Sequence, residues 1–138
     1  MPTIKRFEEI EAWQTARKLT NKIYEISKGG DFSRDFGLSD QIQRAAVSIM
    51  SNIAEGFESQ TQSLFITYLG RAKASAGEVR SQLYVALDQR YINEGQFEEL
   101  SQLVERASRQ LYGFIKYLES QPNIRRVKDG ENIYNIDY

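Results

Sequence analysis

The sequence contains no cysteine and no histidine, and these two absences exclude several classes of functional site. Without cysteine there is no disulfide, no thiolate metal site and no cysteine nucleophile. Without histidine the chain lacks the commonest general base and the commonest metal ligand. Neither a Gly-x-Ser-x-Gly elbow nor a Walker loop is present in the sequence. We therefore expect no metal, no cofactor and no enzymatic activity.

The chain also lacks a strong net charge and a long apolar run. Its 18 basic and 19 acidic residues give a net charge of −1, so any contact with nucleic acid needs a local patch of cations. No segment approaches the ~20 apolar residues that span a bilayer. The first residues carry no apolar stretch of the kind that a secretory signal needs. We expect a cytoplasmic protein that makes no membrane contact.

Proline occurs only at Pro2 and Pro122, so long uninterrupted helices are permitted between them. Apolar residues recur at intervals of three and four over four segments, 7–28, 38–57, 64–91 and 97–118. This spacing is typical of helices that bury one stripe. No window of useful length alternates apolar and polar residues with a period of two. The sequence therefore predicts an all-α protein.

Turn and cap signals separate the four segments. Gly29 and Gly30 follow the first segment, Ser39 is a candidate N-cap for the second, and Asn93 with Gln96 resembles a capping box before the fourth. Short connections favour antiparallel neighbours, which predicts an up-down-up-down four-helix bundle over residues 1–121. Residues 122–138 lack helical spacing and are expected to form either a disordered tail or a docked strap.

The second helical segment carries short polar side chains on the face opposite its apolar stripe. This polar face comprises Arg44, Ser48, Ser51, Asn52 and Glu55. Serine and asparagine have lower helix propensity than the Lys, Glu and Gln of an ordinary solvated face. Short side chains also allow another backbone to approach closely. We interpret the face as a subunit interface in a homo-oligomer; the alternative is a solvated helix that tolerates serine.

The third segment presents cations and tyrosines on one line, Lys73, Arg80, Tyr84 and Tyr91, spaced seven, four and seven residues apart. Cations neutralise phosphates and tyrosines stack on bases, so this line is a candidate contact for RNA or single-stranded nucleic acid. The alternative is a helix margin whose tyrosines pack while its cations extend into solvent.

Two further groups of charged residues have structural interpretations. Glu55 and Glu78 are a conceivable carboxylate pair, but Arg44 and Arg80 favour structural ion pairs with them instead. On the fourth segment, cations and acids alternate along one face, which indicates a solvated surface. The residues of this last face are Glu98, Glu105, Arg106, Arg109 and Lys116.

Three strings in the sequence carry a family resemblance. They are residues 7–14 (Phe-Glu-Glu-Ile-Glu-Ala-Trp-Gln), 45–49 (Ala-Ala-Val-Ser-Ile) and 51–56 (Ser-Asn-Ile-Ala-Glu-Gly). The chain resembles the four-helix-bundle family whose founding members are encoded in intervening sequences of bacterial 23S ribosomal RNA genes. The accessory variability protein of diversity-generating retroelements is similar to this family. The resemblance implies an antiparallel four-helix protomer, a ring-shaped homopentamer and, for most members, no known enzymatic activity. The retroelement relatives bind a reverse transcriptase and RNA through a strongly basic surface.

This chain departs from the family pattern by losing cations. Gln43 stands where the family usually has a second basic residue before Arg44, and the turn at 58–63 lacks basic residues. Tight RNA binding is therefore not expected. We interpret the protein as a non-enzymatic, homo-oligomeric scaffold, with itself and a protein as partners. The alternative is an RNA-associated accessory protein that binds RNA weakly and works with a reverse transcriptase or ribosomal RNA.

Overall fold

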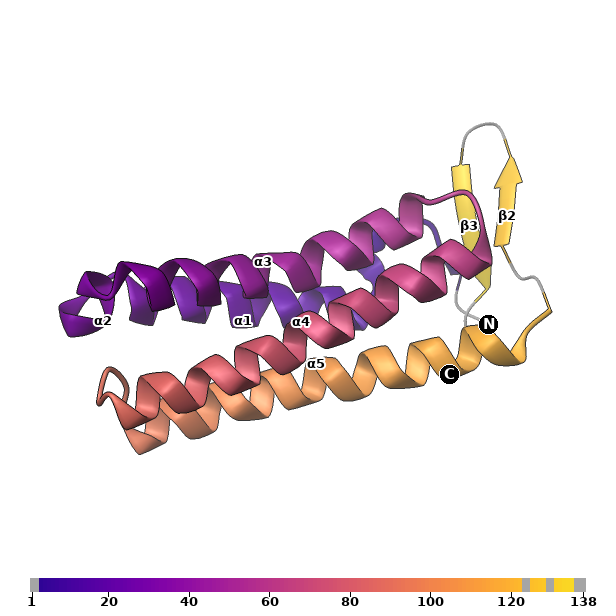
Figure 1. The fold of residues 1–138 in the computed structure, drawn as a ribbon. Helices are drawn as coiled ribbons and strands as arrows, with labels where there is room; N and C mark the ends of the chain where they lie inside the picture. The colour runs from indigo at the N-terminus through magenta and orange to yellow at the C-terminus, as the bar shows by residue number, and fades with distance from the viewer. Residues whose placement is uncertain (1–2, 123–124, 129–130, 136–138) are drawn as a thin grey trace.

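The computed structural model describes residues 3–122, 125–128 and 131–135, and four long helices make up most of them (Figure 1). A one-turn 3₁₀ helix, η1 (Phe7–Glu9), precedes the first long helix, and a short helix, α2 (Gly30–Arg34), follows it. The long helices are α1 (Glu11–Ser27), α3 (Phe36–Glu58), α4 (Gln62–Asp88) and α5 (Glu94–Ser120). The all-α prediction is confirmed for this helical body.

The four long helices pack side by side around one core (Figure 1). Helix α1 contacts α3 and α5, and α4 contacts the same two helices, so α3 and α5 lie diagonally across the bundle. The turns at 59–61 and 89–93 are short, as the sequence predicts. Helix α5 has a groove on each side, one shared with α4 and one shared with α1.

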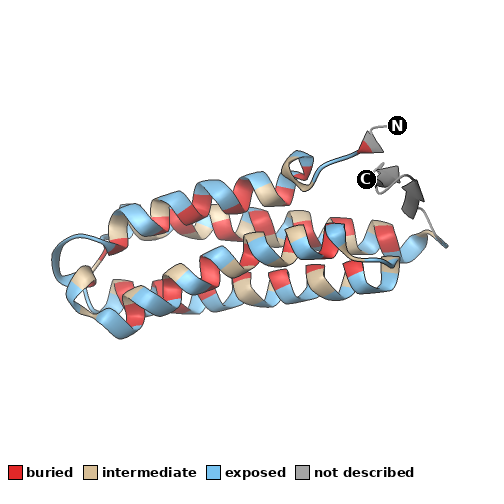
Figure 2. Ribbon diagram, turned by 90° about the horizontal axis from the view of Figure 1, so that it is seen from above, coloured by how far each residue is buried: buried red, intermediate tan, exposed pale blue. Residues whose placement is uncertain are grey.

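The core is made of the apolar stripes that the spacing predicts (Figure 2). Three phenylalanines cluster in the core near the α3–α4 turn, where Phe65 makes edge contacts with Phe57 at 6.2 Å and with Phe114 at 5.2 Å between ring centroids. Edge-to-face contacts of this kind add to the free energy gained from apolar burial. On α5 the buried residues repeat at intervals of three and four: Leu100, Val104, Ala107, Leu111, Phe114 and Leu118.

Caps define where the helices begin. The capping box of α5 is confirmed, since the Asn93 side chain accepts from the Gln96 backbone N–H at 2.8 Å and the Gln96 side chain accepts from Asn93 at 2.9 Å. The N-cap of α3 is Asp35, whose carboxylate accepts from the Leu38 N–H at 3.1 Å. The expectation of Ser39 as this cap is therefore wrong, because α3 begins at Phe36 and Ser39 lies inside it.

Two predicted helix ends are also corrected. The first segment divides at Ile10, whose extended backbone separates η1 from α1. Helix α4 ends at Asp88, and the chain then turns through Arg90 at a φ of 65°. Tyr91 consequently lies beyond the helix, where helical spacing no longer places it. Gly30 has a φ of 59°, the left-handed conformation expected of the Gly29-Gly30 pair.

Three short strands, which the sequence analysis did not predict, lie at the end of the bundle away from α2 (Figure 1). They are β1 (Thr3–Ile4), β2 (Arg125–Lys128) and β3 (Glu131–Asn135), in the order β1-β3-β2 with antiparallel pairing throughout. The described part of the C-terminal tail thus pairs with the N-terminal strand. The tail positions 123–124, 129–130 and 136–138 lie outside the described residues.

Close packing of α3 on α4 depends on one glycine, Gly56. A Cβ at this position would lie 2.8 Å from the Cβ of Tyr68 and 2.9 Å from Cδ1 of Phe65. We predict that Gly56→Ala lowers the free energy of unfolding by about 1–3 kcal/mol, because overpacking outweighs the gain in helix propensity.

The matched control for this prediction is Gly77→Ala in α4, where a Cβ meets nothing within 4 Å. It should raise stability by up to about 1 kcal/mol through helix propensity alone. Urea unfolding of the two variants measures both changes, and equal effects would contradict the packing explanation.

Candidate functional surfaces

The polar face of α3 is partly engaged within the protomer. The Ser48 hydroxyl lies 2.9 Å from the hydroxyl of Ser75 on α4. The Asn52 side-chain amide donates to the Ser48 carbonyl at 2.8 Å and to its hydroxyl at 3.0 Å. Ser48 and Asn52 are therefore half-buried in a seam between α3 and α4. Ser75 also belongs to this seam. The sequence analysis did not identify it, because spacing within one helix does not show contacts between helices.

The other three residues of that face point outward. Ser51 and Glu55 are exposed, and Arg44 forms a 2.9 Å ion pair with Asp40 one turn earlier in α3. The expected pairing of Arg44 with a glutamate opposite it is therefore corrected, because an i,i+4 carboxylate lies within reach on the same helix. The face thus consists of a hydrogen-bonded inner edge and an exposed outer edge.

Gln43, which stands where the family resemblance implies a cation, has a structural role here. Its side-chain amide donates to the Ser27 hydroxyl at 2.8 Å and so links α3 to α1. Ser27 is fully buried, and its own hydroxyl donates to the Ile23 carbonyl at 2.6 Å. Gln43 makes this link without placing a charge beside the buried hydroxyl, as a cation at the same position would.

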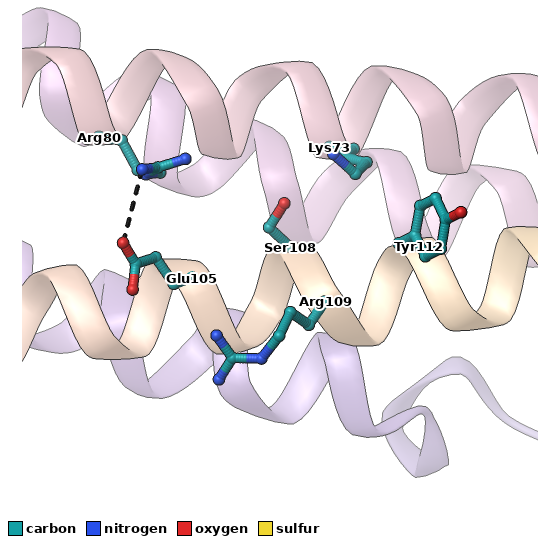
Figure 3. A pocket seen from close by; sticks show the side chains of 6 residues that line it. All are labelled: Lys73, Arg80, Glu105, Ser108, Arg109 and Tyr112. Atoms are coloured by element: carbon teal, nitrogen blue, oxygen red, sulfur yellow. Dashed lines mark ion pairs between the residues drawn. The ribbon is translucent and has the colours of Figure 1, made fainter.

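The structure brings Lys73 and Arg80 together in one groove between α4 and α5 (Figure 3). The groove has a volume of about 460 Å³. Arg80 forms a 3.5 Å ion pair with Glu105, so its expected pairing with Glu78 is corrected. The α5 side of the groove is lined by Glu105, Ser108, Arg109 and Tyr112.

The two tyrosines of the predicted line have different environments. Tyr84 lies on α4, where its ring makes an edge contact with Phe97 of α5 and remains 55% exposed. Tyr91 is not placed with the other three residues of the line. Its ring stacks on Phe32 at 5.4 Å, and its hydroxyl donates to Asp35 at 3.0 Å. Tyr91 therefore connects the α4–α5 turn to the start of α3.

A second groove, of about 480 Å³, lies between α1 and α5 and was missed by the sequence analysis. Its cations come from two helices, and Lys22 is paired with Glu99 at 2.6 Å, which raises the pKa of Lys22 through that hydrogen bond. Arg109 lines both grooves. The cations on α5 could have indicated this groove. Spacing within one helix, however, does not show that α1 contributes further cations to it. The charged residues lining this groove are Lys18, Lys22, Glu99, Arg106 and Arg109.

The described residues hold neither a candidate metal cluster nor a helix that could span a membrane. In that part of the chain, no three acidic side chains gather closely enough to hold a metal ion. None of the described helices combines the length and apolar character needed to cross a bilayer.

Comparison with known proteins places the chain in a family. The sequence profile of the 23S rRNA-intervening sequence protein matches residues 8–113, which is more than half of the chain. The chain belongs to this family. Its fold is similar to the crystal structure of a protein of unknown function from the S23 ribosomal protein family of Bacteroides thetaiotaomicron, with a TM-score of 0.70 and 25% sequence identity. The alignment covers 76% of this chain and 95% of that one. No curated protein matches the sequence significantly.

The Tyr91–Asp35 contact makes a pH-dependent contribution to stability. The hydrogen bond to Asp35, with burial and the nearby negative charge, raises the pKa of Tyr91 above its usual value of about 10. A raised folded pKa stabilises the protein below pH ~10, and this contribution is lost as the pH rises further.

We predict that Tyr91→Phe lowers the thermal midpoint by a few degrees near pH 7, because the hydroxyl's hydrogen bond is lost. The difference from the unmodified protein should stay constant up to pH ~9 and shrink above pH ~10. Thermal unfolding followed by circular dichroism over this pH range measures it. A difference that grows at high pH would contradict the assignment.

Proposed function

We propose that the protein is a non-enzymatic, homo-oligomeric scaffold that works in the cytoplasm. Its protomer is an up-down-up-down four-helix bundle, and the protomers form a ring that is a homopentamer, as the family resemblance implies. Partner proteins are held on the ring. The sequence supports the absence of catalysis, because it supplies neither the histidine nor the cysteine that most nucleophilic and general-base mechanisms use.

The observation that carries the proposal is a line of small and apolar residues that is exposed on the outer face of α4. On α3 the exposed residues Val47 and Ser51 are small or apolar, and the charged residues Arg44 and Glu55 lie one turn to either side of them. On α4 an exposed line of small and apolar residues runs beside them: Ser63, Thr67, Gly70, Ala74, Ser81 and Val85. A solvated helix face normally carries long charged side chains, whereas small residues let another helix approach closely. In the homo-oligomer that we propose, a second copy of the chain packs against this face.

Ser51→Arg tests the assembly, because this exposed residue points away from the protomer's own core. It is a cleaner choice than Ser48, whose hydroxyl is already bonded to Ser75. We predict that the unmodified protein has a mass five times the 15.9 kDa chain in light scattering, and that Ser51→Arg lowers this mass towards the monomer.

The matched control is Asn21→Arg, which places the same side chain on an exposed position of α1. It should leave the mass unchanged. A mass of 15.9 kDa for the unmodified protein at micromolar concentration would overturn the oligomer. An unchanged mass in Ser51→Arg would place the interface on another face.

A second candidate function is that of an RNA-associated accessory protein, working with a reverse transcriptase or ribosomal RNA. The observation that favours it is the groove between α4 and α5, where Lys73, Arg80 and Arg109 lie with an exposed tyrosine, Tyr112 (Figure 3). Cations and exposed aromatic rings together fit single-stranded RNA. Because the net charge is −1, the expected binding is weak, tolerant of sequence and strongest at low salt.

We predict that fluorescence anisotropy detects binding of a single-stranded RNA at about 50 mM salt, with an affinity that falls steeply as salt is added. Replacing Lys73 and Arg80 by Gln should flatten the salt dependence. Tyr112→Ala should weaken binding with little change in that dependence, because Tyr112 lines the groove and stacking releases no counterions. If no binding is detected at 50 mM salt, this candidate is removed and the scaffold remains.

A further inference from the structure

The two grooves beside α5 form one continuous cationic surface. Arg109 lines both of them, and in Figure 3 its side chain leaves α5 on the side away from Lys73. From Arg109, one groove leads to Lys18 on α1 and the other leads to Lys73 on α4. We call this surface the transverse band, defined by Lys18, Arg106, Arg109, Lys73 and Arg80.

Most cations of the transverse band are available to a ligand. Within the described part of the chain, Lys18, Lys73, Arg106 and Arg109 have no ion pair, whereas Arg80 is held by Glu105. The neighbouring Lys22 is likewise held in an ion pair, with Glu99. The band thus brings four unpaired cations from three adjacent helices to one side of the bundle.

The dimensions of the band suit a polymer of phosphates. A helix is about 10–12 Å wide with its side chains, so a chain that crosses α5 from one groove to the other spans more than that distance. A nucleic-acid strand carries one phosphate per nucleotide, so a strand that crosses α5 places more than one phosphate on the band. Tyr112, 54% exposed in the α4–α5 groove, adds an aromatic ring beside them.

We propose that single-stranded RNA binds across the bundle, with its backbone on the transverse band and Arg109 at the centre. This inference rests on the RNA-associated function proposed above and changes where the contact lies. The predicted line along α4 contributes only Lys73 and Arg80. The remaining contacts come from α5 and α1, on the face that sequence spacing alone indicates as merely solvated.

Glu105 limits the affinity of this surface. Its carboxylate forms an ion pair with the Arg80 guanidinium at 3.5 Å, where a phosphate oxygen would otherwise bind. A phosphate must therefore displace Glu105 before it gains Arg80 as a partner, and the carboxylate also repels the backbone. Removing this charge should strengthen RNA binding, an effect that loss of folding cannot imitate.

The first test measures anisotropy of a fluorescent 20-nucleotide oligouridine RNA against the full-length protein at several salt concentrations. We expect Arg109→Gln and Lys18→Gln each to weaken binding about five- to tenfold at 50 mM salt and to reduce the salt slope by about 0.7. The matched control is Arg34→Gln on α2, an exposed arginine outside the band whose loss changes the net charge equally. It should change the affinity less than twofold.

The second test uses a gain of binding. Glu105→Gln releases Arg80 and should tighten binding about five- to tenfold at 50 mM salt. Its control is Asp31→Asn, which removes the carboxylate paired with Arg34 at 3.1 Å and so releases an arginine outside the band. Asp31→Asn should have an effect of less than twofold.

The outcomes separate this inference from the function on which it rests. If the unmodified protein binds the RNA but Arg109→Gln and Lys18→Gln behave like Arg34→Gln, RNA binding stands and the transverse band is wrong. If the unmodified protein does not bind at all, both are overturned. Oligoglutamate of equal charge is added as a competitor. If it displaces the RNA at the same charge concentration, the band is a site for acidic protein rather than RNA.

Discussion

Burial of one apolar stripe from each of the four long helices is the interaction on which the rest of the structure depends. The stripe on α5, from Leu100 to Leu118, repeats at intervals of three and four, and this repeat decides which residues between them point outward. Because the core fixes how the helices face one another, it also fixes which outer flanks adjoin. Lys73 and Arg109 line one groove for this reason, although neither contributes to the core.

The outer surface then divides into two regions of different chemistry. The outer face of α4 carries small and apolar residues such as Ala74, and in the seam between α3 and α4 the side chains of Ser48, Asn52 and Ser75 bond within the protomer. The surface around α5, which lies diagonally across from α3, carries the four unpaired cations of the transverse band. In the function that we propose, self-association uses one region and RNA the other, so the two would not compete for the same residues.

The sequence predicts the helices well because their signal is local. Apolar spacing and the Asn93–Gln96 box need only neighbouring residues, and both predictions are confirmed. The candidate sites depend on distant residues and were predicted only in part. Tyr91 was misplaced because a positive φ at Arg90 follows the end of α4. The α1–α5 groove was missed because Lys18 and Arg109 are far apart in sequence. The partners of Arg44 and Arg80 were misjudged for a related reason, since spacing alone does not rank competing carboxylates.

The central claim is that the homo-oligomer and the RNA use separate faces of the same bundle. Native mass spectrometry of the full-length protein with oligouridine RNA at low salt tests this claim most directly. The account predicts one species that contains RNA together with the same number of subunits as the free oligomer. RNA found only on single 15.9 kDa chains, or RNA that dissociates the oligomer as it binds, would contradict it.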